Sequence, residues 1–343
     1  SGAARYENGE LLLEESRTNE VRYSEQFDNA AWTKSNAAVT PNNTVAPDGT
    51  QSADLLYSTT TGVANTSRNI GGVSSTPYTA SVYLKSAGFT WAFVYGAQGN
   101  VKAYFNLITG VIGTVDAGAT AAISSAGNGW YKCSVTQTVT YRFFAVGLAD
   151  ADGSNTSTSS GTSGIYIWGA QVEAGSFPTS YIPTTSGSTV TRSPDIASIE
   201  GTNFSSWYNS TAGSFYADVK AYGTSTGSSR IIGTDQIATP LYYNTTADTI
   251  KSYGNTVGPT VSGLIAFGRH KAGMAYATGD EAISVNGGTV ATSAVGFNNT
   301  SNTVTAVALF AVTSGSEKTT GHITRLAYYP YRLSDTILQE ITS

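Results

Sequence analysis

Apolar and polar side chains alternate in short runs along most of the chain, which is the pattern of half-buried β-strands. Residues 89–95 place Phe, Trp or Tyr at every second position, and residues 131–135 do the same with Tyr, Cys and Val. The pattern predicts an all-β protein with minimal helix, built as two antiparallel β-sandwich domains of the jelly-roll type in tandem. Turn-forming residues separate the runs, at Pro47-Asp48-Gly49, Gly71-Gly72, Gln98-Gly99-Asn100, Gly127-Asn128-Gly129 and Asp152-Gly153.

The alternation resumes in the second half of the chain, at residues 215–221 and 304–312. Between these runs, Asn286-Gly287 predicts a β-hairpin, because both central residues of the tightest turns need a positive φ. Only residues 334–341 have a helical pattern. There Ser334 is the expected N-cap, and the apolar stripe consists of Ile337, Leu338 and Ile341.

The length of 343 residues is typical of two domains, and the best boundary is the stretch Thr179–Pro194. This stretch is rich in Ser, Thr and Pro and carries a single charge, Arg192, which favours a semi-extended connector. We therefore expect a leader at residues 1–18, a first domain at 19–178, a linker at 179–194 and a second domain at 195–343. The charged leader surrounds Leu11–Leu13 and is either a short helix or an extended segment that packs on the next domain.

The composition of the chain argues against several classes of function and of stabilising site. Only 12% of residues are Asp, Glu, Lys or Arg, the net charge is −5, and the 18 basic residues are scattered, which argues against a nucleic-acid partner. The apolar runs are too short to insert into a membrane. A single cysteine, Cys133, excludes an internal disulfide, and two histidines leave too few ligands for a Cys/His zinc site.

No arrangement of residues in the sequence carries catalysis, so we expect a protein that is not an enzyme. Asp280 and Glu281 are adjacent and flanked by Gly279, which favours a solvated turn over a pair of catalytic carboxylates. His270 and His322 have no nucleophile motif beside them and are interpreted as strand-edge residues. Cys133 shares the apolar face of its run and is interpreted as a buried thiol.

Three segments give the chain a family resemblance. Residues 9–19 (GELLLEESRTN), 23–34 (YSEQFDNAAWTK) and 165–184 (IYIWGAQVEAGSFPTSYIPT) resemble a recurrent module of bacteriophage and prophage tail-fibre-like proteins. The resemblance implies that residues 19–178 are similar to the jelly rolls of carbohydrate-binding modules. It also implies a virion tail location outside the cell, other tail proteins as partners, and a homotrimer.

The second half resembles a concanavalin A-like, laminin-G-type lectin domain. The resemblance rests on residues 213–219 (GSFYADV), 270–276 (HKAGMAY) leading into 282–288 (AISVNGG), and 323–329 (ITRLAYY). Together the two resemblances imply a non-catalytic tail fibre, that is, a receptor-binding adhesin that recognises a bacterial surface glycan.

Aromatic side chains with amide and hydroxyl neighbours are the residues that hold a sugar, because its C–H face is apolar and its rim is hydroxylic. Most aromatics of a sandwich belong to its core. Tyr242, Tyr243 and Asn244 follow Pro240 in an expected loop, and together with Tyr253 they are the predicted ligand patch. The other aromatics considered are Trp32, Tyr57, Trp91, Tyr95, Trp130, Trp168, Trp207 and Tyr208.

A structural calcium (Ca2+) is the one cofactor we expect, because sandwiches of both types often bind it through carboxylates. The candidate ligands are Glu25, Asp28 and Glu173, which lie near the two chain ends that a jelly roll brings together. Surface solvation accounts for these residues equally well.

Two other functions stay open at this point. The chain fits a carbohydrate-binding accessory region of a secreted polysaccharide-degrading enzyme, and it fits a purely structural virion fibre without a receptor. The sequence identifies neither the glycan nor the host.

Overall fold

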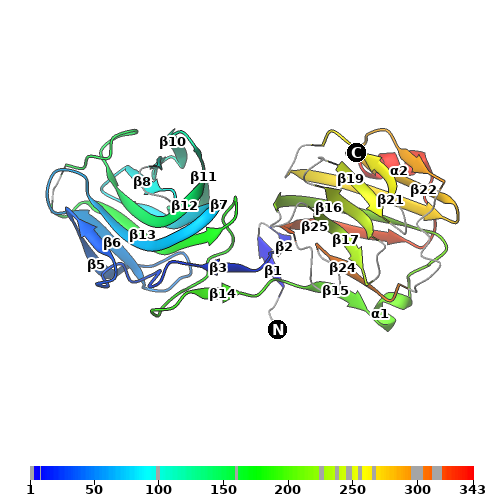
Figure 1. Ribbon diagram of the computed structural model, residues 1–343, viewed down its shortest axis with the longest axis horizontal. Coiled ribbons are helices and arrows are strands. Elements are labelled where there is room, and N and C mark those ends of the chain that lie inside the picture. Colours follow the sequence, from blue (N-terminus) through cyan, green and yellow to red (C-terminus); the bar gives the residue numbers. More distant parts are fainter. Residues whose placement is uncertain are drawn as a thin grey trace. The chain divides into compact units, whose positions relative to one another are not determined.

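The computed structural model describes residues 4–7, 9–97, 101–158, 161–223, 228–235, 239–244, 249–253, 257–264, 268–294, 304–310 and 319–343. The chain divides into two compact units. The first unit is Arg17–Arg192, and the second unit combines Ser1–Ser16 with Ser193–Ser343. Both units are all-β, with antiparallel ladders between their named strands, as the alternation predicts (Figure 1).

The first unit is one large sheet that folds over on itself. The strand order is β10-β9-β8-β12-β7-β13-β6-β5, with β11 against β12 and β4 against β7, while β3 and β14 form a separate pair. The strands are β3 (Arg17–Asn19), β4 (Thr33–Ser35), β5 (Ala37–Thr44), β6 (Ala53–Ser58), β7 (Asn65–Ala87), β8 (Trp91–Tyr95), β9 (Lys102–Asn106), β10 (Val111–Val115), β11 (Ala119–Gly127), β12 (Trp130–Ala149), β13 (Gly164–Ala174) and β14 (Val190–Arg192).

Strands β7 and β12 create both layers of this sandwich, because they pair with each other along almost their whole length. Strands β4 and β8 pair with one half of this ribbon, and β11 and β13 with the other half. Gly71, with a φ of 116°, lies where the register of the ribbon shifts. The turn predicted at Gly71-Gly72 is therefore wrong: these glycines allow β7 to bend without ending it.

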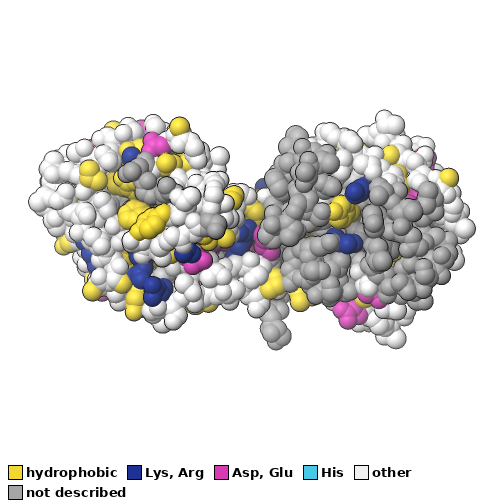
Figure 2. Space-filling view, in the orientation of Figure 1, with side chains coloured by type: hydrophobic (Ala, Val, Ile, Leu, Met, Phe, Trp, Pro, Cys, Tyr) yellow, Lys and Arg dark blue, Asp and Glu magenta, His cyan; other side chains and the backbone are white. Residues whose placement is uncertain are grey.

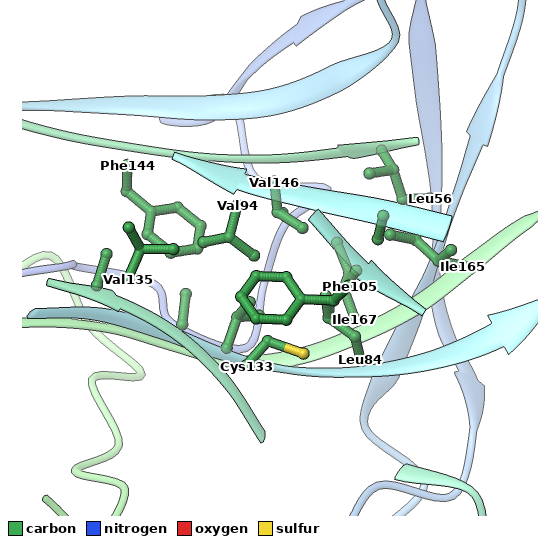
Figure 3. Packing of buried hydrophobic residues seen from close by; sticks show 14 of the residues in the cluster. Leu56, Leu84, Val94, Phe105, Cys133, Val135, Phe144, Val146, Ile165 and Ile167 are labelled. Carbon is green, nitrogen blue, oxygen red and sulfur yellow. The ribbon is translucent and has the colours of Figure 1, made fainter. Parts of the chain in front are cut away.

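The core of the first unit lies between the two halves of the folded sheet. Val94 and Phe105 face Leu84 and Cys133 across the interior (Figure 3). The thiol of Cys133 is fully buried, and burial raises its pKa well above the ordinary value. The prediction of a buried thiol is confirmed.

The second unit consists of two sheets. One is seven-stranded, in the order β1-β2-β25-β16-β21-β22-β23, and the other is six-stranded, in the order β15-β24-β17-β18-β19-β20. Its elements are β1 (Arg5–Glu7), β2 (Glu10–Leu13), β15 (Ala197–Glu200), α1 (Thr202–Ser205), β16 (Gly213–Gly223), β17 (Ser228–Thr234), β18 (Thr239–Asn244), β19 (Thr249–Tyr253), β20 (Val257–Val261), β21 (Arg269–Ala277), β22 (Asp280–Val285), β23 (Ala291–Ser293), β24 (Ala306–Leu309), β25 (Thr320–Tyr329) and α2 (Asp335–Ile341).

The predicted hairpin and helix of the second unit are confirmed. Asn286 and Gly287 have φ values of 51° and 68°, and the Gly288 amide donates to the Val285 carbonyl at 2.9 Å. Ser334 caps α2 by accepting a hydrogen bond from the Ile337 amide. The apolar stripe of α2 is narrower than expected, because Leu338 and Ile341 pack on the sheet while Ile337 is 40% exposed.

The predicted leader at residues 1–18 needs correction, because its strands β1 and β2 belong to the second unit. Strand β2 pairs with β25, so that Leu13 stands opposite Gly321 and enters the core. Gly321 leaves no room for a side chain, since an added Cβ would lie 2.3 Å from the Lys220 carbonyl oxygen. Of the two readings of Leu11–Leu13, the extended conformation is correct, since the leucines form a strand. The predicted partner is wrong: they pack on a sheet of the second unit, not on the domain that follows next in the sequence.

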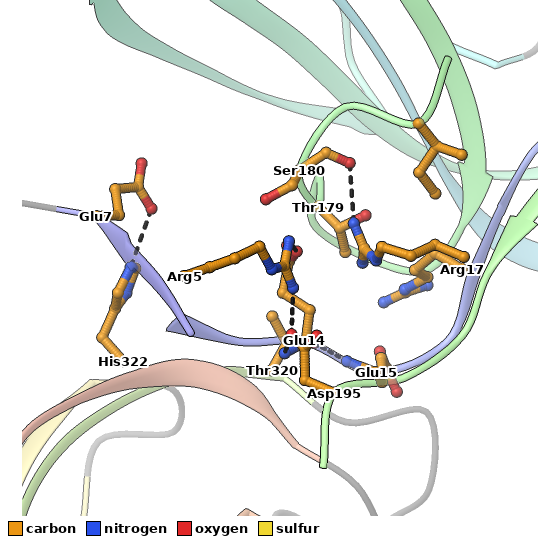
Figure 4. A network of polar contacts seen from close by, with 12 residues as sticks. Arg5, Glu7, Glu14, Glu15, Arg17, Thr179, Ser180, Asp195, Thr320 and His322 are labelled. Atoms are coloured by element: carbon orange, nitrogen blue, oxygen red, sulfur yellow. Dashed lines mark hydrogen bonds and ion pairs between the residues drawn. The ribbon is translucent and has the colours of Figure 1, made fainter. Parts of the chain in front are cut away.

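Polar contacts fasten the same segment within the second unit (Figure 4). Arg5 forms ion pairs with Glu14 and Asp195, and the Glu14 amide donates to the Asp195 carboxylate at 2.8 Å. The Glu15 amide donates to the Thr320 hydroxyl at 3.1 Å. These bonds satisfy polar groups at the ends of β1 and β2 that would otherwise need water. The segment up to residue 16 is thus part of the second unit, and the boundary between the units lies at residues 16–17.

The predicted linker at 179–194 also needs correction, because its first residues are packed into the first unit. Thr179, Ile182 and Thr184 are buried. The Ile182 amide donates to Gln171, and its carbonyl accepts from Asn19. Side-chain hydrogen bonds thus hold the first part of this stretch in place, and its last part, β14, pairs with β3. The second boundary falls at residues 192–193.

The buried position of Leu13 gives a stability prediction. Leu13→Ala should lower the free energy of unfolding of the second unit by about 2–4 kcal/mol, because it leaves a cavity beside β25. Native-state hydrogen exchange of amides in β16 and β25 measures this loss, while amides in β7 and β12 of the first unit should keep their protection.

The matched control is Ile196→Ala, since Ile196 is in the same unit and is 62% exposed. Its effect should stay within about 0.5 kcal/mol. Equal effects of the two substitutions would contradict the packing of β2 as a structural strand.

Candidate functional site

The predicted ligand patch falls on strands, and of its two described side chains, Tyr242 and Tyr243, that of Tyr242 faces away from the core. Pro240 and the three residues after it are part of β18, not of a loop. Leu241 and Tyr243 are buried in the core of the second unit, whereas Tyr242 is half-buried on the opposite face. Tyr243 is therefore a core residue, because successive side chains of a strand point to opposite sides. The side chains of Asn244 and Tyr253 lie outside the described residues.

Tyr242 is the centre of a cross-strand row on the outer face of the six-stranded sheet. Arg230 stands opposite Tyr242 on β17, Lys251 on β19, and Thr260 follows opposite Lys251 on β20. The Arg230 guanidinium carbon lies 5.9 Å from the centre of the Tyr242 ring, and the Lys251 Nζ lies 5.1 Å from it. Two cations thus flank one aromatic ring through cation–π contacts.

This row, which we call the Tyr242 row, offers the chemistry that a sugar needs. The phenol ring supplies an apolar surface for a C–H face, and the guanidinium and ammonium supply N–H donors for hydroxyl or carboxylate oxygens. The sequence contains a signal for the two cations: Arg230, Tyr242 and Lys251 each stand next to inward-facing residues of their strands. The sequence does not reveal the strand register that makes Arg230, Tyr242 and Lys251 neighbours.

A second feature of the same unit is an apolar pocket of about 450 Å³. It is lined by Trp207 and Tyr328, whose ring centres are 4.9 Å apart, and by Ile199, Phe215 and Leu326 among others. The Tyr328 hydroxyl is engaged with Asn209. The pocket can hold an apolar group, but it presents few polar atoms to a ring of sugar hydroxyls. Trp207 was a candidate by residue type alone.

The remaining tryptophans of the first unit confirm that most aromatics belong to the interior. Trp32, Trp130 and Trp168 are buried. Trp91 and Tyr95 are half-buried and pack around Phe93 in a small cluster apart from the main core. Figure 2 shows charged side chains of the first unit as isolated spots on a surface that is otherwise mostly uncharged.

The predicted calcium ligands are not brought together. Glu25 and Asp28 line one pocket, whereas Glu173 is buried elsewhere. Glu173 accepts hydrogen bonds from the Thr179 amide at 2.8 Å and the Thr179 hydroxyl at 2.7 Å, so protein donors occupy both of its oxygens. Within the described ranges, no group of three or more His, Cys, Asp or Glu residues is placed to hold a metal ion. This donor set therefore does not fit calcium.

Asp54 is the third carboxylate beside Glu25 and Asp28. It is 1% exposed and accepts hydrogen bonds from the Phe27 and Asn42 amides, both at 2.9 Å. Burial outweighs these two bonds and raises the pKa of Asp54 to about 6. Burial also raises the pKa of Glu25, whose carboxylate accepts a hydrogen bond from the Tyr181 hydroxyl.

The structure corrects the predicted surroundings of the acidic and histidine residues that were considered as catalytic candidates. Asp280 forms an ion pair with Arg332, but Glu281 is buried, and burial raises its pKa. The solvated-turn reading is therefore wrong for Glu281, which lies within β22. His270 and His322 are also buried, because β21 and β25 are interior strands of their sheet rather than edges.

The raised pKa of Asp54 predicts a pH dependence of stability. Between about pH 4 and pH 6 the unfolded chain loses the Asp54 proton while the folded chain keeps it, so the free energy of unfolding should fall by up to about 3 kcal/mol. Urea unfolding at several pH values, compared between the wild type and Asp54→Asn, isolates this contribution. A difference between the two proteins that does not change with pH would contradict it.

No helix in the described part of the chain is long and apolar enough to cross a membrane. No protein-family model and no curated protein matches the chain. Among solved structures, the chain is similar to domains LG4-5 of the mouse laminin alpha1 chain. The identity is 10%, the match covers 96% of this chain and 92% of that chain, and the TM-score is 0.25. A likeness of this size transfers neither ligand nor activity, so function has to be argued from the residues themselves.

Proposed function

We propose that the protein is a non-catalytic adhesin of a bacteriophage tail that binds a bacterial surface glycan. The Tyr242 row is the observation that carries the glycan-binding part of this proposal. The row lies on a sheet face turned away from the core and combines an aromatic ring with two cationic donors and a threonine. It therefore offers stacking and hydrogen bonding at one place.

The composition of the chain supports the same function. Only 12% of its residues are charged, and its Ser, Thr and Asn residues supply neutral hydroxyl and amide groups. Such groups match the hydroxyls of a neutral or weakly charged polysaccharide. The tail location rests on residues 9–19, 23–34 and 165–184, which resemble the module of phage tail-fibre-like proteins.

Substitution of Tyr242 tests glycan binding. Tyr242→Ala should weaken binding to immobilised bacterial lipopolysaccharides, capsular polysaccharides or teichoic acids by about tenfold or more, since one stacking surface is lost. Surface plasmon resonance on a panel of these glycans measures the effect.

Tyr331→Ala is the matched control, because Tyr331 belongs to the same unit, is 55% exposed and lies outside the Tyr242 row. It should bind as the wild type does. Binding only to plant or algal polysaccharides would favour an accessory region of a degrading enzyme, and no glycan binding at all would favour a purely structural fibre; either result contradicts the proposal.

We further propose a homotrimer, which the resemblance to tail fibres implies. Ile108 and Val111 are exposed at 61% and 54%, and β10 is an edge strand, so apolar groups and unpaired backbone are present where subunits could meet. Multi-angle light scattering at micromolar concentration should give the mass of three chains. A monomer under these conditions would contradict this part of the proposal.

A further inference from the structure

The first unit contains a polar pocket of about 310 Å³ that the proposed function does not use. It lies where three segments meet: residues 20–22 after β3, residues 68–70 in β7, and residues 187–189 before β14. An amide, Asn69, and two hydroxyl residues, Ser188 and Thr189, form part of its lining. These groups can donate hydrogen bonds to a ligand.

Arg68 is a buried cation without a counter-ion at this pocket. It is only 9% exposed, and no described carboxylate forms an ion pair with it. Its hydrogen bond to the Ala31 carbonyl is long, at 3.5 Å. Burial, followed by the charge of Arg22, lowers the pKa of Arg68. Burying a charge without a partner is unfavourable. An anion that binds Arg68 from the pocket side would offset much of this penalty, which favours binding.

Arg22 brings a second positive charge to the same pocket. It is exposed, and one of its guanidinium nitrogens donates to the Gly187 carbonyl at 3.1 Å. A guanidinium has five N–H donors in a planar fork, so this bond orients Arg22 and leaves donors for a ligand. Two cations beside one pocket repel each other, and an anion between them removes the repulsion.

The acidic residue in the lining does not cancel these charges. Glu20 forms an ion pair with Arg142 at 3.1 Å, and Arg142 also donates to the Gly72 carbonyl at 3.0 Å. Glu20 and Arg142 therefore balance each other. Arg22 and Arg68 are left as the net charge of the pocket.

Tyr23 packs against Arg68 and has a strained backbone conformation. Its φ is 60°, a left-handed conformation that bulky residues rarely adopt. The ring lies 5.7 Å from the guanidinium carbon of Arg68. A Cβ on Gly187 would lie 3.0 Å from the Tyr23 hydroxyl, so the chain at 187 passes close to the same ring. Strained residues of this kind gather at binding sites, where the strain fixes the positions of other groups.

From this arrangement we propose that the first unit binds an oxyanion between Arg22 and Arg68. The ligand is a carboxylate, phosphate or sulfate group, because planar guanidinium groups bind the paired oxygens of these anions through two parallel hydrogen bonds. Asn69 and the hydroxyls of Ser188 and Thr189 take the remaining oxygens or the hydroxyls next to the anion. The site lies in a different unit from the Tyr242 row, so each can fail without the other.

Titration calorimetry at low ionic strength tests the proposal on the full chain. The probes are inorganic phosphate, sulfate, glucuronate and neutral glucose. At least one of the three anions should bind saturably, glucose should not, and added sodium chloride should weaken binding. Binding of phosphate or sulfate alone assigns a tetrahedral anion, whereas binding of glucuronate alone assigns an acidic sugar.

Arg22→Gln and Arg68→Gln should each weaken anion binding by about tenfold or more, since each removes charge-assisted hydrogen bonds. Lys85→Gln is the matched control: Lys85 lies near the other end of β7, and its loss changes the net charge equally. Because Arg22 is exposed, its variant tests the site even if Arg68→Gln folds poorly.

Arg68→Met separates binding from structure. A ligand site predicts that this variant is as stable to urea as the wild type, or more stable, since an uncompensated buried charge has been removed. A structural role for Arg68 predicts a clear loss of stability. No saturable binding of any anion, or anion binding unchanged in both Gln variants, would overturn the proposal.

Discussion

The alternation of side chains across each strand is the constraint on which this molecule depends. Every strand has to turn one row of side chains inward, so the neighbours of that row necessarily face outward. In β18 this places Tyr243 in the core and Tyr242 outside, although the two residues are adjacent and chemically identical. In β12 it places Cys133 in the dry interior. Core and candidate ligand surface are thus two sides of the same strands.

Features that depend on neighbouring residues could be predicted from the sequence. The positive φ values at Asn286 and Gly287 and the cap at Ser334 need only a few adjacent residues. The bend of β7 at Gly71 could not be separated from a turn, because glycine serves both purposes and the pairing with β12 decides between them. The burial of Glu281 was missed for a similar reason: the turn ends at Gly279, and every residue of β22 after Asp280 is buried.

Sites made by distant segments depend on strand register and chain reversal, which no short motif encodes. Tyr242 was found by residue type, but Arg230 and Lys251 became its neighbours only through the pairing of three strands. Arg22 and Arg68 lie 46 positions apart and meet residues 187–189 only after the sheet has folded. The one acid in the lining of that pocket, Glu20, is paired with Arg142, so the two arginines remain without a carboxylate partner there.

The course of the chain between the units explains why the sequence boundaries were misplaced. The chain enters the first unit at residues 16–17 and leaves it at 192–193, so the first unit is an insertion into the second. A fragment that starts at residue 195 would lack β2, and β25 would become an edge strand with exposed backbone groups. It would also lack Leu13 from the core. Strands β1 and β2, which lie within the predicted leader at residues 1–18, therefore complete the seven-stranded sheet of the second unit.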